Sequence, residues 1–86
     1  MERGLGGIDT AFVGRYGSGK PVIGFLGEFD ALEGLSQKAG SCVQEPVIPG
    51  GNGHGCGHNL LGCGALAAAA ALKDYMEQYH LPGTVC

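Results

Sequence analysis

The chain has 86 residues, a formal net charge of −3, and 18 glycines, 4 prolines and 4 cysteines. This length permits one small domain, and five scattered basic residues give a nucleic-acid backbone little to hold, so we expect neither a second domain nor nucleic-acid binding. The longest apolar stretch, Leu60 to Leu72, is too short to cross a bilayer, and membrane binding is not expected either.

Two β-prone runs open the chain. Thr10 to Tyr16 and Val22 to Glu28 are separated by Gly17 to Pro21, a loop composition that predicts an antiparallel hairpin. The second run is apolar on both faces, which is typical of a strand buried inside a sheet. Asp30 follows just past its end, where supporting groups of active sites often lie, although an aspartate there also caps turns.

A long loop and a helix follow. Glu33 to Asn52 lacks periodicity and is rich in glycine and proline, which indicates a loop. Asn59 is a reasonable N-cap for a helix that runs to about His80. The first half of this helix is nearly all Ala, Leu and Gly and should be enclosed, whereas the second half is amphipathic and should reach the surface. Thr84 to Cys86 has the composition of the start of a strand. The fold class is therefore predicted as α/β, with a β-hairpin, a long loop and a buried alanine-rich helix.

The run Gly53 to Asn59 carries the strongest chemical signal. Side chains two residues apart point to the same side of an extended segment, so we expect Cys56 and His58 to converge on one ion, with the intervening glycines leaving the approach open. A thiolate and an imidazole suit zinc or another borderline divalent metal. The alternative is a glycine-rich connection in which Cys56 is a small buried side chain and His58 bonds to backbone. The spacing favours ligation, although a stable site needs further ligands from elsewhere.

A second glycine pattern lies in the predicted helix. Gly62 to Ala67 matches the G-x-G-x-x-A fingerprint of dinucleotide-binding proteins. No strand directly precedes it, and its glycines fall inside the helix rather than in a strand-to-helix turn. We therefore interpret these glycines as sites of close helix packing.

The segments GIDTAFVGRYGSGKPVIGFLGEFDALEGLSQKAG and GGNGHGCGHNLLGCGALAAAAALK together resemble the catalytic domain of metal-dependent amidohydrolases (metallopeptidases) of the aminoacylase and hippurate hydrolase family. Within that family they resemble the type that acts on aminobenzoyl-glutamate. The resemblance implies a mixed-sheet catalytic domain, with Cys56 and His58 as ligands of a zinc or manganese centre. It also implies that Asp30 orients a ligand and that His54 supports the site. Ligation by Glu28 and any acid role of Asn59 stay open, because relatives have histidine and aspartate at those positions.

The same resemblance implies a mechanism and a larger enzyme. Two metal ions polarise the amide carbonyl of an acyl or aroyl amino acid, such as p-aminobenzoyl-glutamate, and a glutamate accepts the proton of a bridging water. That glutamate belongs to a Glu-Glu motif that residues 1–86 lack. We therefore expect this chain to be part of a catalytic domain, inactive alone and prone to self-association, from an enzyme that is an oligomer.

Two rival interpretations remain. In the first, Cys42, Cys56, Cys63 and His58 would close a tetrahedral zinc site in a small structural or interaction module. In the second, the chain would be an inactive gene remnant.

The cysteines also bear on the cellular compartment. Because no secretory signal is visible, we expect reduced thiols and a cytoplasmic protein.

Overall fold

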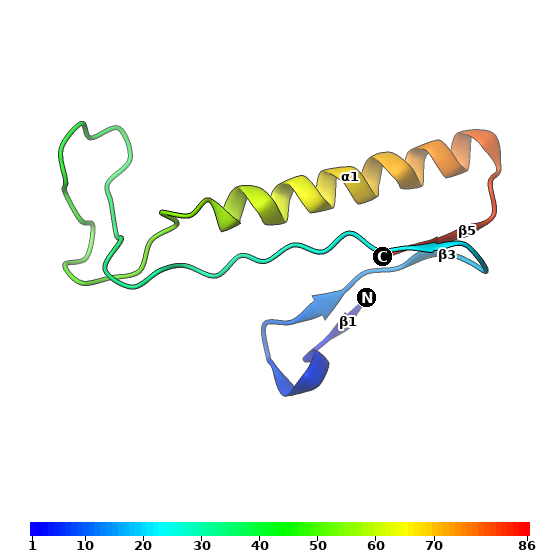
Figure 1. Cartoon of the computed structure of the whole chain (residues 1–86), viewed down its shortest axis with the longest axis horizontal. Helices are drawn as coiled ribbons and strands as arrows, with labels where there is room; N and C mark the ends of the chain where they lie inside the picture. The colour runs from blue at the N-terminus through cyan, green and yellow to red at the C-terminus, as the bar shows by residue number, and fades with distance from the viewer. The chain divides into compact units, whose positions relative to one another are not determined.

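The computed structural model describes all residues, 1–86, as two compact units. The first comprises residues 1–26 and 65–86, and the second comprises residues 27–64. Figure 1 shows the elements in chain order: β1 (Glu2–Arg3), the 3-10 helix η1 (Leu5–Gly7), β2 (Phe12–Val13), β3 (Tyr16–Ser18), β4 (Val22–Ile23), α1 (His58–Tyr79) and β5 (Gly83–Val85). This mixture of strands and one helix agrees with the predicted α/β class.

The main sheet, in the first unit, has three strands in the order β3-β5-β4. β5 runs antiparallel to β3, pairing Tyr16 with Val85, and parallel to β4, pairing Ile23 with Val85. The predicted hairpin is therefore wrong, because β5 lies between the two runs that were expected to pair. An inner strand satisfies backbone donors and acceptors on both of its edges, and Thr84 N–H donates to the Pro21 carbonyl at 2.9 Å on the β4 side.

The first of the predicted β-prone runs divides between two sheets. Its middle forms β2, which pairs with β1 in a small antiparallel sheet, Glu2 opposite Val13. The turn that joins them includes η1. The Arg15 side chain, just after β2, forms an ion pair with Glu2 across this sheet. The run therefore forms two short strands in separate sheets instead of one continuous strand.

The predicted helix is confirmed, with a different start. α1 begins at His58, and the N–H groups of Leu60 and Leu61 donate to the Gly57 carbonyl. Asn59 is thus the second residue of the helix, and its predicted N-cap role is wrong. Gly57 has φ of 76°, a conformation that only glycine adopts without strain, and this sharp turn starts the helix earlier than expected. The helix ends at Tyr79, one residue before the predicted end.

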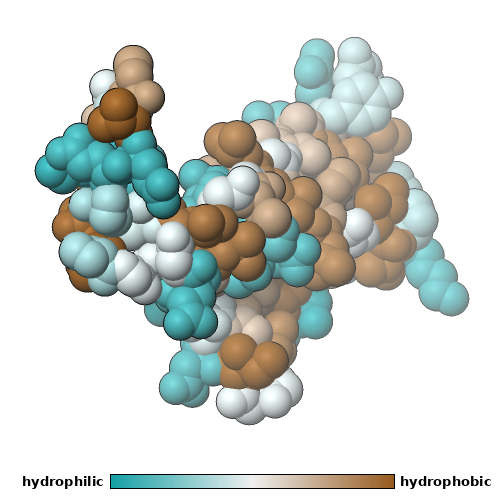
Figure 2. Space-filling model, turned by 60° about the vertical axis from the view of Figure 1, so that its left-hand side comes forward, coloured by the Kyte–Doolittle hydropathy of each residue, from teal (hydrophilic) through white to brown (hydrophobic).

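Burial is much less than the sequence indicates. Val22 is 62% exposed and Leu26 93% exposed, and β4 ends at Ile23, so the prediction of a buried strand over Val22 to Glu28 is wrong. The first half of α1 is not enclosed either, because Leu60 and Leu66 are more than 70% exposed. Figure 2 shows many hydrophobic residues at the surface. The physical reason is that no element of this chain covers these faces.

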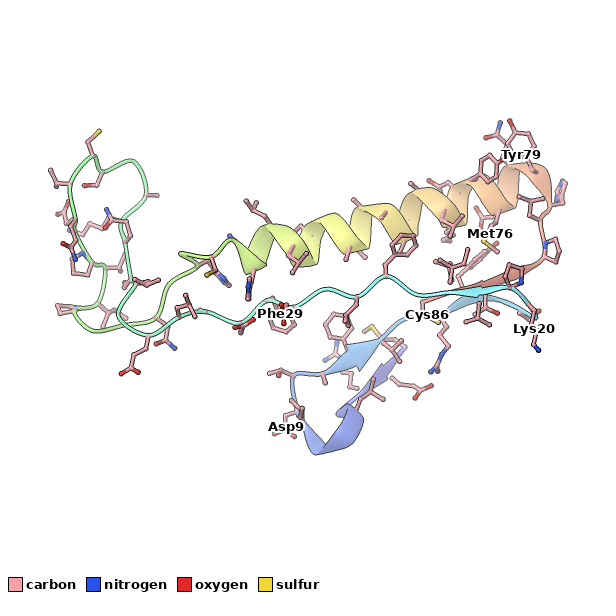
Figure 3. All side chains as sticks on the ribbon, viewed as in Figure 1. Asp9, Lys20, Phe29, Met76, Tyr79 and Cys86 are labelled. Atoms are coloured by element: carbon pink, nitrogen blue, oxygen red, sulfur yellow. The ribbon has the colours of Figure 1, made fainter.

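The core that does form lies between the second half of α1 and the sheet. Met76 is the buried residue of α1, and Val85 and Gly83 are the buried residues of β5. In Figure 3 the Met76 side chain lies between the helix and these strands. The Lys73 ammonium adds a contact on the same side, 5.3 Å from the centre of the Tyr16 ring. No helix in the structure combines the length and the hydropathy that a membrane span requires.

Candidate metal site

Three side chains of the second unit form a cluster of potential metal ligands. They are Glu28, Asp30 and His58, and one ligand atom from each lies within 4.8 Å of the others. The His58 Nδ1–H donates to Asp30 Oδ1 at 2.5 Å, and His58 Nε2 lies 4.0 Å from Glu28 Oε1. The imidazole therefore has one carboxylate at each ring nitrogen.

The local structure explains this meeting. Glu28 and Asp30 are two residues apart in a segment without helix or strand, which Figure 1 shows as an extended stretch, so both side chains project to the same side. His58 is the first residue of α1. The helix approaches the carboxylate segment at Gly62, where a Cβ would lie 3.4 Å from the Glu28 carbonyl oxygen. At Gly62 the helix is therefore in van der Waals contact with this segment, whereas Gly64 has open space around it, so the predicted close-packing role is wrong at Gly64.

The hydrogen bond between Asp30 and His58 shifts both titrations. It is the main cause that raises the pKa of His58 above 6.5, with partial burial acting in the opposite direction. It is also the main cause that lowers the pKa of Asp30 below 3.8. The raised pKa of His58 means that its contribution to stability is complete below 6.5 and is lost as pH rises through the folded value. The lowered pKa of Asp30 means that its contribution is present above 3.8 and is lost as pH falls through its folded value, so the pair stabilises most between 3.8 and 6.5.

The donor set suits a divalent metal. With Nδ1–H bonded to Asp30, the lone pair of the neutral imidazole is on Nε2, which faces Glu28. An imidazole nitrogen and a carboxylate are ligands of zinc and manganese, and a carboxylate on the far ring nitrogen orients such a histidine and raises its basicity. Binding would displace the proton that His58 holds at low pH, so affinity must rise with pH. The predicted supporting role of Asp30 thus acquires a specific partner, His58.

The structure places the other predicted residues outside this cluster. Gly55 and Cys56 lie in a turn and His58 in the helix, so the extended conformation that was to align Cys56 with His58 is wrong. Cys56 is exposed, and its role as a ligand stays a prediction. His54 also lies outside the cluster, and it adds only a small electrostatic contribution, after that of His58, to the lowered pKa of Asp30. Asn59 is exposed in the first turn of α1.

Glu28 is the residue whose role the sequence left open and which the structure brings to His58. The signal was present in the Glu-x-Asp spacing, which puts two carboxylates on one side of an extended segment. The rival four-ligand zinc site is not assembled. All four cysteines are free, three of them are exposed, and the clustered partners of His58 are carboxylates.

Comparison with known proteins shows what the chain is similar to. No family model matches the chain, and no solved structure matches it. The chain is 59% identical over 85 residues to one of the subunits of the p-aminobenzoyl-glutamate hydrolase of Escherichia coli (strain K12). The match covers 99% of this chain and 18% of the length of that protein. The resemblance predicted from the sequence is thereby confirmed, and the chain is a relative of this p-aminobenzoyl-glutamate hydrolase.

Proposed function

We propose that these residues belong to the catalytic domain of a dinuclear-metal amidohydrolase that cleaves an acyl or aroyl amino acid such as p-aminobenzoyl-glutamate. The observation that carries the proposal is the 59% identity over nearly the whole chain to a protein named for that hydrolysis. The cluster of Glu28, Asp30 and His58 supports it, because it supplies imidazole and carboxylate ligands at one place. Residues 1–86 are then the metal-binding part of that domain.

Within this proposal each residue has a separate task. His58 binds the metal, zinc or manganese, through Nε2, and Asp30 holds the ring by its bond to Nδ1–H. Glu28 and Cys56 are the further candidate ligands, the first from the cluster and the second from the predicted motif. A bound divalent ion would polarise the amide carbonyl and lower the pKa of water. The chain's own carboxylates would balance part of the positive charge of that ion.

The isolated chain is proposed to be inactive. The family's base is a glutamate of a Glu-Glu motif, and residues 1–86 contain no such pair. Losing a general base alone costs about 10² to 10⁴ in rate. Glu33 and Glu45, in the long loop, lie outside the His58 cluster and do not replace the base.

A chimera tests the function directly. The matched segment of the Escherichia coli protein would be replaced by residues of this chain, and hydrolysis of p-aminobenzoyl-glutamate would be measured with the partner components that the parent enzyme needs. We expect activity close to that of the parent, lowered by at least about a hundredfold by His58→Ala. His80→Asn is the matched control, because His80 follows the helix with φ of 51°, a conformation that asparagine tolerates. A folded chimera that hydrolyses the substrate equally well with His58→Ala would contradict the assignment.

Self-association and location are part of the same proposal. The exposed leucines of α1 and the exposed residues of β4 leave apolar surface that a second copy of the chain or other parts of an oligomer would cover. Sedimentation of the isolated chain should therefore show oligomers, and a monodisperse monomer would contradict this. Four free cysteines are consistent with the proposed cytoplasmic location, where thiols stay reduced.

A further inference from the structure

The base of the long loop in the second unit is closed by backbone pairing. Leu32 and Gly53 form an isolated antiparallel bridge, in which each N–H donates to the other's carbonyl at 2.9 Å. Farther into the loop, Ser36 N–H donates to the Gly51 carbonyl at 3.0 Å. Backbone hydrogen bonds therefore join the two chain segments at the base of the loop.

Both residues of this bridge lie close in sequence to residues of the metal cluster. Leu32 lies two residues after Asp30, and Gly53 lies five residues before His58. The chain between Asp30 and His58 passes through the whole loop, so the approach of the two side chains depends on closing it. Along the chain from Asp30, the bridge is the first place where backbone hydrogen bonds join the segment that carries the two carboxylates to the segment that carries His58.

Gly53 is the residue that the bridge requires. A Cβ at this position would overlap the carbonyl oxygen of Leu35, and it would lie 2.9 Å from the Ser36 nitrogen. These are backbone atoms, which cannot rotate away as a side chain does. Gly55 differs, because its Cβ would meet only the end of the Leu35 side chain, which has room to move.

We propose that Gly53 is a positioning residue of the metal site: it lets the Leu32–Gly53 bridge form, and the bridge sets the carboxylates of Glu28 and Asp30 against His58. This inference rests on the proposed function for its consequence, metal binding. Its structural part, the approach of Asp30 to His58, does not. A substitution at Gly53 thus acts on the site without touching a ligand.

Metal binding and a spectroscopic signature provide the test. Co²⁺ would be titrated into the 86-residue chain and its visible absorption recorded, with Zn²⁺ competition to give affinities. Gly53→Ala should weaken binding by about 10- to 100-fold, the range found when a group that orients a ligand is lost, and should change the Co²⁺ spectrum. Gly24→Ala is the control, because Gly24 also lies outside any helix or strand and has open space around its Cβ position.

Gly55→Ala and Leu35→Ala separate a backbone clash from a side-chain clash. Gly55→Ala should bind Co²⁺ as the wild-type chain does, because the end of the Leu35 side chain that its Cβ would meet can rotate away, and Leu35→Ala should not restore binding to Gly53→Ala, whose clash is with backbone atoms. Leu32→Pro removes the Leu32 N–H, one of the two donors of the bridge, and should reproduce the effect of Gly53→Ala. If circular dichroism shows that Gly53→Ala has lost the α1 helix, Leu32→Pro is the variant that tests the role of the bridge. Wild-type affinity and spectrum in folded Gly53→Ala, or rescue of that variant by Leu35→Ala, would overturn the proposal.

The experiments distinguish an error in the role of Gly53 from an error in the proposed function. If the wild-type chain binds no ion, the nuclear Overhauser contacts between the His58 ring and the Asp30 methylene still report the positioning. Their loss in Gly53→Ala would uphold the role of Gly53 and leave only the proposed function in error. Their persistence in that variant would overturn the role of Gly53.

Discussion

Met76→Ala provides the sharpest test of how α1 is attached to the sheet. Met76 is 8% exposed, so the substitution removes three side-chain heavy atoms from an environment that excludes water. At about 0.8 kcal/mol for each methylene-sized group, the transfer contribution is about 2 kcal/mol. A groove of 140 Å³ already adjoins Met76, with Pro21, Ile23 and Leu81 among its lining residues. Water can enter the vacated space from this groove, so the added cavity cost should be small and the total should lie near the lower end of the usual range of about 2 to 5 kcal/mol.

That loss is large for this chain. Native domains have about 0.05 to 0.15 kcal/mol of stability per residue, and a chain with so small a core belongs at the lower limit, about 4 kcal/mol. Met76→Ala should therefore remove about half of the free energy of unfolding. Urea titrations followed by the helical circular dichroism would measure it, at concentrations where the midpoint does not depend on concentration. Leu66→Ala is the control in the same helix, because Leu66 is 71% exposed, and it should change stability by less than about 0.5 kcal/mol. Equal losses from both substitutions would refute the assignment of the buried face.

Three further predictions concern the site and the sheet. Asp30→Asn should bring the pKa of His58 down towards 6.5, measured by the pH dependence of its ring protons, and an unchanged pKa would show that the hydrogen bond does not form. Gly17→Ala should destabilise the fold by at least about 1 kcal/mol in urea titrations, because Gly17 has φ of 84° and its Cβ would overlap a carbonyl oxygen of β5. Zinc should protect Cys56 from alkylation more than Cys63, and equal protection of the two thiols would remove Cys56 from the ligands.

Local features of the sequence determined the helix, the long loop and the family. The alanine-rich run up to Tyr79 has helical propensity throughout, and Pro82 cannot continue a helix, so the element and its end were predictable from neighbouring residues alone. The glycines and prolines between Glu33 and Asn52 likewise exclude regular structure over short distances. The resemblance came from motifs of consecutive residues, and such motifs do not depend on how the chain folds.

Only the tertiary structure decided which segments meet. β5 comes from the end of the chain and lies between two strands near its start, and no property of Thr10 to Glu28 reveals a competing partner some 60 residues away. The pairing of Asp30 with His58 likewise joins residues 28 positions apart, on either side of the long loop. Conversely, the extended conformation expected around Cys56 and His58 was a local inference that is wrong, because Cys56 lies in a turn and His58 in the helix. Burial also depends on which elements cover a face, and that is a property of the assembled fold rather than of the hydrophobic residues themselves.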